Sequence, residues 1–160
     1  MTLPGALAGG FVGTLVLTTA LLACTELRLT RIDLPFLLGT AFTADRVRAR
    51  ALGYGLHFLA GFAFATIYYL VFRAIGESNW WLGALFGMLH GLFAATALVS
   101  VLLPLVHPRM GSDATAAHAQ PLLEPPGFLM LNYGASTPVL TVAIHVAYGA
   151  IVGAFTLGLG

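Results

Sequence analysis

The chain has 160 residues, of which 59% are hydrophobic and 8% are charged, and its formal net charge is +1. Soluble domains carry about 25% charged residues, so this composition excludes an ordinary soluble domain and predicts that lipid is the solvent. The small net charge also gives no electrostatic steering toward nucleic acid, so no nucleic-acid partner is expected.

Four apolar stretches follow one another along the chain, at about 3–27, 51–72, 80–103 and 138–159. A helix that crosses a bilayer needs about 20 predominantly apolar residues, and each stretch reaches this length. No charged residue interrupts them, apart from Glu26 at the end of the first. We therefore expect an all-α membrane protein with four transmembrane helices in a single domain, and short interfacial segments in connections one and three.

The basic residues predict how these helices are oriented. The first connection contains Arg28, Arg31, Arg46, Arg48 and Arg50. Arg109 begins the third connection, whereas Arg73 lies in the short second connection on the opposite side. Because arginine-rich loops stay in the cytoplasm, connections one and three are predicted to be cytoplasmic and both termini to lie outside.

The first and third stretches resemble each other without a gap. The first reads GALAGGFVGTLVLT from Gly5, and the third reads GALFGMLHGLFAAT from Gly83. This likeness predicts an internal repeat of about 5–72 and 83–159, folded as two tandem helical hairpins related by a pseudo-two-fold axis along the membrane normal. The alternative is that glycine-rich membrane helices resemble each other by composition alone.

Glycines recur every four residues within the stretches and therefore lie along one face of each helix. In lipid, helices associate through close van der Waals packing, which small residues allow. The predicted helix-packing residues are Gly5, Gly9, Gly13, Gly61, Gly83, Gly87, Gly91, Gly149 and Gly153. Their spacing leaves open whether the contacted helix belongs to this chain or to another copy.

Three histidines interrupt the apolar stretches, namely His57, His90 and His145. His57 and His145 occupy matching positions in the predicted repeat, in HFLAG and HVAYG, on faces with small residues. An ionisable residue inside a membrane marks a candidate site, because burying it unpaired is costly. The three imidazoles are therefore candidates for neutral hydrogen bonds between helices, for ligation of haem or a metal by His57 and His145, or for a proton or ion path.

The segments IDLPFLLG, GLHFLAGFAFATIYYLVF and GALFGMLHGL, which lie in the first connection and in the second and third stretches, resemble a family of small bacterial four-span membrane proteins with no assigned activity. The resemblance implies a multi-pass protein of the bacterial inner membrane. It assigns no catalytic residue to this chain.

No nucleophile, metalloprotease, phosphate-binding or dinucleotide-binding motif occurs in the sequence, so no catalytic residue and no metal site are predicted. His107 and His118, with Asp113 and Glu124, have no metal-ligand spacing and are interpreted as solvated loop residues. We expect a non-catalytic structural or accessory protein without a cofactor, which associates with itself or with a larger membrane complex. The alternatives are a carrier or channel with a histidine-lined path, and a haem- or metal-binding electron carrier.

Overall fold

The computed structural model describes residues 1–110 and 123–157. The elements in chain order are α1 (Leu3–Glu26), α2 (Leu34–Thr40), α3 (Arg46–Ile75), α4 (Trp80–Phe93), η1 (Ala94–Leu102), α5 (Leu103–Val106), η3 (Phe128–Tyr133) and α6 (Thr137–Thr156). The described part of the chain is helical and contains no strand. Four helical runs are long and apolar enough to cross a membrane: α1, α3, the continuous run from α4 to α5, and α6. The prediction of an all-α protein with four such helices is confirmed.

The helix ends follow local capping chemistry. The side chain of Asp45 accepts a hydrogen bond from the backbone N–H of Arg48 at 2.8 Å, and this cap starts α3 at Arg46. The first connection is therefore shorter than the sequence predicted, because Arg46, Arg48 and Arg50 lie on the helix. At the other end of α3, Gly76 takes a left-handed backbone conformation (φ 85°), which glycine adopts without steric cost.

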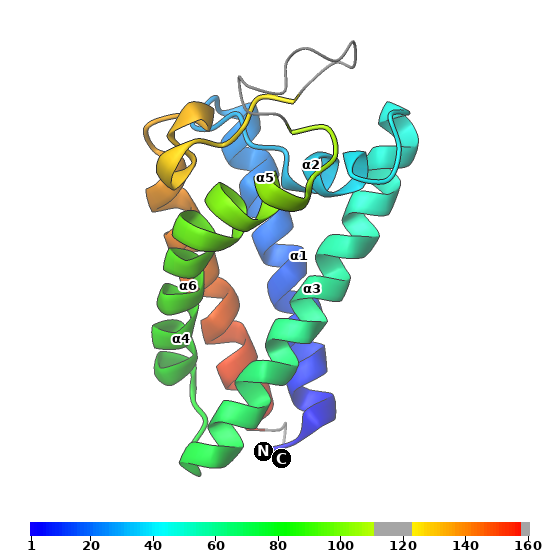
Figure 1. Ribbon diagram of the computed structural model, residues 1–160. Coiled ribbons are helices and arrows are strands. Elements are labelled where there is room, and N and C mark those ends of the chain that lie inside the picture. Colours follow the sequence, from blue (N-terminus) through cyan, green and yellow to red (C-terminus); the bar gives the residue numbers. More distant parts are fainter. Residues whose placement is uncertain (111–122, 158–160) are drawn as a thin grey trace.

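The third membrane-length run changes its winding halfway along. Residues 94–102 form a π-helix, η1, between α4 and α5. Pro104 has no N–H to donate to the carbonyl four residues earlier, and its ring crowds that turn. The hydroxyl of Ser100 donates to the carbonyl of Ala95, five residues back, at 2.6 Å. The run bends here, so that α5 crosses the upper part of the bundle in Figure 1.

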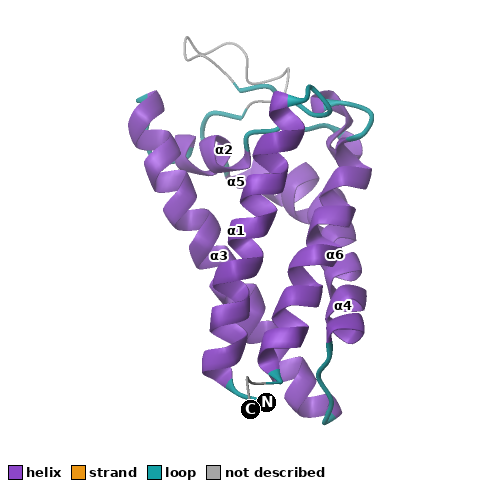
Figure 2. Cartoon of the chain, turned by 180° about the vertical axis from the view of Figure 1, so that it is seen from behind, coloured by secondary structure: helices purple, strands orange, loops and turns teal. Residues whose placement is uncertain are grey.

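The helices pack unequally. Helix α6 makes its most extensive contacts with α4 and then with α1, and α1 also packs against α3. Helix α3 makes few backbone contacts with α6 and fewer with α4. In Figures 1 and 2, α3 diverges from the other helices toward the end of the bundle opposite the chain termini.

Short helices and loops cover that diverging end. We call residues 28–45, 103–110 and 123–136 the cap; they include α2, α5 and η3. Figures 1 and 2 show the cap at one end of the bundle and both termini at the other. Connections one and three therefore lie on the same side, as four consecutive spans require.

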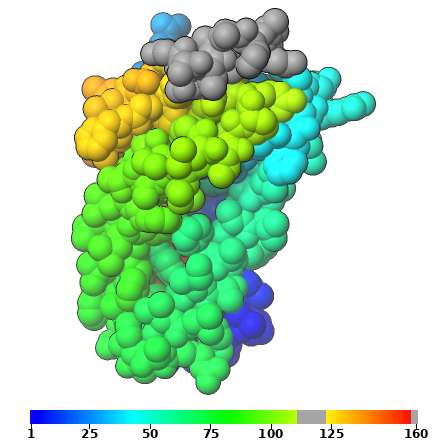
Figure 3. Space-filling model, in the orientation of Figure 1, coloured from blue at the N-terminus to red at the C-terminus, as the bar shows by residue number. Residues whose placement is uncertain are grey.

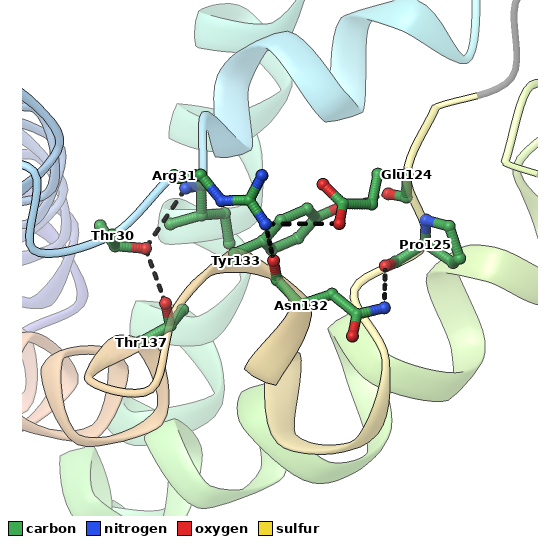
Figure 4. A network of polar contacts seen from close by, with 8 residues as sticks. Thr30, Arg31, Glu124, Pro125, Asn132, Tyr133 and Thr137 are labelled. Carbon is green, nitrogen blue, oxygen red and sulfur yellow. Dashed lines mark hydrogen bonds and ion pairs between the residues drawn. The ribbon is translucent and has the colours of Figure 1, made fainter.

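A polar network joins the two main parts of the cap (Figure 4). The backbone N–H of Arg31 donates to the carbonyl of Tyr133 at 2.7 Å, and its guanidinium pairs with Glu124 at 3.3 Å and donates to the carbonyl of Asn132. The hydroxyls of Thr30 and Thr137 lie 2.8 Å apart. These contacts hold the first connection against the segment that leads into α6.

His107 corrects the interpretation of a solvated loop residue. Its side chain is buried in the cap, and Nε2 lies 3.0 Å from the carbonyl oxygen of Leu37 and 3.3 Å from the hydroxyl of Thr40. A carbonyl oxygen only accepts, so the proton lies on Nε2, and Nδ1 accepts from the backbone N–H of Arg109 at 3.2 Å. His107 therefore fastens the end of α5 to α2.

Of the residues considered with His107, Glu124 is exposed and pairs with Arg31. Asp113 and His118 lie outside the described residues, as does the end of the fourth predicted stretch beyond 157.

Candidate functional site

The glycine rows of α1 and α4 both face α6. A Cβ added at Gly9 would lie 3.0 Å from Cα of Val152, and one at Gly91 would lie 2.7 Å from Cα of Val142. Gly5 and Gly13 likewise face Phe155 and Tyr148 of α6. Any side chain at these positions would push α6 away, so the rows fix the distance between the three helices.

The remaining predicted packing glycines also contact this chain. Gly83 and Gly87 face Gly149 and the backbone of His145 on α6, and Gly153 faces the turn before α4. Gly61 on α3 faces the side chain of Thr14 on α1. The glycine faces predicted from the sequence are thus used inside the chain.

The four helices do not meet in the pairs that an equal two-fold arrangement requires. Helix α1 packs closely on α6, whereas the corresponding pair, α3 and α4, stays apart at the backbone. Between α3 and the α4–η1–α5 run lies a cavity of about 520 Å³. Figure 3 shows the surface hollowed between the green atoms of the α4–η1–α5 run and the blue-green atoms of α3.

All three predicted histidines line this one cavity. Helix α3 contributes His57, the end of α4 contributes His90, and α6 contributes His145. The sequence placed His57 and His145 at matching positions of the predicted repeat. The structure also brings His90 and His145 together, with their ring centroids 4.6 Å apart in an edge-to-face arrangement.

His57 is the buried polar side chain without a partner. The residue is 8% exposed, and its Nε2 makes no hydrogen bond to any described residue. A buried polar group that is left unsatisfied costs about 1–3 kcal/mol, and such groups are rare in native proteins. His57 therefore keeps unused hydrogen-bonding capacity at the cavity wall, although Nε2 itself is enclosed by the protein.

The other two imidazoles have partial partners. Nδ1 of His145 lies 2.7 Å from the carbonyl oxygen of Thr141, so it carries the proton and leaves Nε2 as an acceptor. Nδ1 of His90 lies 3.4 Å from the hydroxyl of Tyr68, a long contact, and its ring stacks on Phe64 with centroids 3.8 Å apart. Each of these imidazoles keeps one ring nitrogen outside these contacts.

The cavity is closed toward both ends of the bundle. Toward the termini, Tyr68, Phe72 and Phe86 stack edge to face or tilted, with ring centroids 5.6–6.1 Å apart. Toward the cap, its walls include Leu34 on α2 and Met130 on η3. The hollow therefore opens sideways, between α3 and η1, at the depth of the apolar helices.

The lining is apolar apart from imidazoles and hydroxyls, and within residues 1–110 and 123–157 it includes no arginine, aspartate or glutamate. The hydroxyls of Thr14 and Tyr148 already donate to the carbonyls of Gly10 and Gly61, at 2.7 and 2.6 Å. Unused hydrogen-bonding capacity in the cavity is thus concentrated on the three histidines and the hydroxyl of Thr141, and these neutral groups make the cavity a site for an uncharged molecule.

The geometry gives little support to haem or metal ligation. For the predicted ligand pair of His57 and His145, the ring of His90 abuts that of His145, with centroids 4.6 Å apart, and takes up space that a macrocycle beside His145 would need. Within residues 1–110 and 123–157, no group of three or more His, Cys, Asp or Glu side chains is placed to hold a metal ion.

Three further residues of the site were not singled out by the sequence analysis. Thr14, Phe64 and Thr141 line the cavity; the two threonines are polar residues within apolar stretches and could have been found by that signal, whereas Phe64 gives none. Ser100 is the residue whose role depends most on the fold, because its hydroxyl also accepts from the backbone N–H of Met130 in the cap, at 3.2 Å.

The chain matches no protein-family model, no curated protein and no solved structure. The functional argument therefore depends on the geometry of the cavity, and membership of a bacterial four-span family stays a prediction.

Proposed function

We propose that this protein is a non-catalytic integral membrane protein that binds a lipid-soluble molecule inside the bilayer. The observation that carries the proposal is the apolar cavity of about 520 Å³, open sideways between α3 and η1 and lined by the three histidines. Sites for small molecules commonly measure 300–1,000 Å³ and combine apolar walls with a few polar groups. A ligand that enters from the side needs no aqueous route.

A channel or a proton path is a weaker proposal. The cavity walls carry no carboxylate to accompany the imidazoles, and the aromatic side chains of Tyr68, Phe72 and Phe86 fill the space toward the termini. An ion path needs a continuous polar or hydrated lining. Ligation of haem by His57 and His145 is weaker still, since the ring of His90 lies against that of His145, with centroids 4.6 Å apart.

Placement in the bacterial inner membrane, with the cap in the cytoplasm, also belongs to this proposal. Its support is the concentration of arginines at the cap end, from the first connection through the first turns of α3. The two tandem hairpins and their origin by duplication remain proposals based on the repeated sequence. The unequal packing of α3 and α4 means that such repeats have diverged in how they pair.

Association with copies of itself or with a larger membrane complex has less support than the sequence suggested. The sequence left open whether the glycine faces pack against a helix of another protein. In the structure these faces contact α6, α4 or α1 of the same chain. An accessory role in a membrane assembly stays a proposal. In that role the protein would contribute its bound molecule to the assembly, and no glycine face would be needed for the contact.

A cavity-filling substitution tests the proposal. Ala60 lines the cavity, so Ala60→Trp places an indole where the ligand would lie. Ala63, three residues on, is exposed on the same helix, and Ala63→Trp is the matched control. We expect native mass spectrometry of protein purified in mild detergent to find an apolar molecule at 1:1 on the wild type and the control. Ala60→Trp should carry at least about tenfold less, a difference of about 1.4 kcal/mol. Equal loading of the two variants, or no bound molecule on any of the three proteins, would contradict the proposal.

A further inference from the structure

We propose that the ligand is a prenylquinone-type molecule, a neutral ring with two carbonyl oxygens that lies among His57, His90 and His145 while its isoprenoid tail leaves between α3 and η1. This inference rests on the proposed function and names the chemical class of ligand for the same cavity.

The absence of charge from the lining excludes ionised head groups. Among the described residues, no arginine, aspartate or glutamate lines the cavity, and the sequence contains no lysine. A phosphate, carboxylate or ammonium group placed there would be desolvated without a counter-charge, which costs far more than burying a neutral polar group. The ligand that the lining accommodates is therefore uncharged.

The position of the polar groups fixes the orientation of the ligand. The imidazoles lie inside the bundle between membrane-length helices, whereas the mouth of the cavity, between α3 and η1, is apolar. A phospholipid in a bilayer has the opposite arrangement, with its polar group at the surface. A quinone fits, because its ring carries the polar atoms and its tail is a hydrocarbon that is at home among lipid chains.

The number of available donors favours two acceptor oxygens. Each neutral imidazole carries one N–H. That of His145 is used by the carbonyl of Thr141, while Nε2 of His57 has no partner. The phenol of Tyr68 can donate to Nδ1 of His90, which places the proton of that ring on its other nitrogen.

When Tyr68 donates to His90, His57 and His90 offer two N–H donors to a ligand, beside the hydroxyl of Thr141. A ring with two carbonyl oxygens satisfies both donors, whereas the single hydroxyl of a sterol-like alcohol satisfies one. A hydrocarbon satisfies neither and would leave His57 as it is in the unliganded cavity, buried and unpaired.

The test uses the full-length protein, stripped of bound lipid by detergent exchange and probed with decylubiquinone. We expect 1:1 binding, detected by native mass spectrometry and by a rise in thermal midpoint. His57→Phe keeps a ring of similar size and removes the donor, and should weaken binding at least about tenfold. Tyr54→Phe removes a polar group from the same helix outside this cavity, and should bind as the wild type does.

A ligand-side comparison does not depend on the folding of a variant. Decylbenzene has the same tail length and an aromatic ring without carbonyl oxygens, and should bind the wild type at least about tenfold more weakly than decylubiquinone. Equal binding of the two compounds, unchanged binding to His57→Phe, or tighter binding of a sterol or of palmitic acid would overturn the quinone inference and leave a lipid-binding cavity in place. If none of these compounds binds and Ala60→Trp has no effect on bound lipid, the proposed function fails as well.

Discussion

Two seams between helices differ in this molecule. Along the seam that joins α6 to α1 and α4, glycines bring the backbones together, and a Cβ at Gly9 or Gly91 would already meet Cα atoms of α6 at 2.7–3.0 Å. Along the seam between α3 and η1, the backbones stay apart and enclose about 520 Å³. The seam between α6 and its neighbours fixes the arrangement of the helices, and the seam between α3 and η1 provides space for a ligand.

The contrast between these two seams shows how a small membrane protein can combine a rigid frame with a binding site. In lipid, helices gain little from excluding solvent, so a seam without close packing has weak internal attraction. The α3–η1 seam is held at its two ends instead, by the aromatic cluster near the termini and by the cap, where His107 fastens α5 to α2. Helix α3 can therefore diverge in between.

Adding a side chain to the closely packed seam between α6 and its neighbours should have the largest effect on stability. Gly87→Leu would place a side chain against the backbone of His145, and we expect a loss of at least about 3 kcal/mol or failure to fold. Gly55→Leu is the control, because no atom lies within 4 Å of a Cβ built at Gly55. Unfolding in mixed micelles followed by circular dichroism measures both. Similar stability of the two variants would mean that the α4–α6 seam is not closely packed.

Releasing the cap should have the next largest effect. His107→Phe removes the proton donor to Leu37 and the acceptor for Arg109, so we expect a loss of about 2 kcal/mol. Hydrogen exchange should become faster in residues 34–40, while the α4–α6 seam stays protected. Unchanged exchange in α2 would show that His107 does not hold the cap.

A histidine-to-phenylalanine substitution at the seam between α3 and η1, which we call the open seam, should increase stability. His57→Phe removes a buried nitrogen that has no partner, so the ligand-free protein should be more stable by about 1 kcal/mol. The measurement is the free energy of unfolding after lipid removal. A loss comparable to that of His107→Phe would indicate that His57 has a structural partner and would remove the case for a binding role.

The smallest effect concerns the pH dependence of the cap. Burial raises the pKa of Tyr133 to about 12 from a usual value of 10.0, and the negative charge of Glu124 acts in the same direction. The positive charge of Arg31 lowers this pKa, but its effect is smaller. The folded protein thus favours the neutral phenol, which donates to the carbonyl of Glu124 at 2.7 Å. This contribution to stability is complete below pH 10 and is lost as the pH rises toward 12.

Absorbance of tyrosinate, taken as the difference between wild type and Tyr133→Phe, measures this titration. A midpoint near pH 12 is expected, whereas a midpoint near 10 would show that Tyr133 is not buried in the cap.

The sequence predicted those features that depend on composition and local spacing. Apolar length predicted the four helices, and four-residue spacing placed glycines such as Gly9 and Gly91 on packing faces. It did not predict the start of α3, because the capping role of Asp45 depends on the backbone geometry at Arg48. It also missed η1, since the rewinding depends on Pro104 and on the hydroxyl of Ser100 acting together with the cap.

The candidate site was predicted only in part, for a similar reason. Position in the sequence identified His57, His90 and His145 as unusual, but it could not show that the three line one cavity. Whether imidazoles share a cavity depends on which helices meet, and here α1 rather than α3 takes the place beside α6. The burial of His107 likewise depends on α2, about 70 residues away along the chain, as the separation from Leu37 shows.

The most direct test of the open seam is an electron-density map of the wild-type protein crystallised from a lipidic phase. We expect continuous non-protein density between α3 and η1 that reaches the side chain of His57, with α6 packed on the glycines of α1 and α4. A map in which α3 lies directly against η1, with no space at His57, would contradict it.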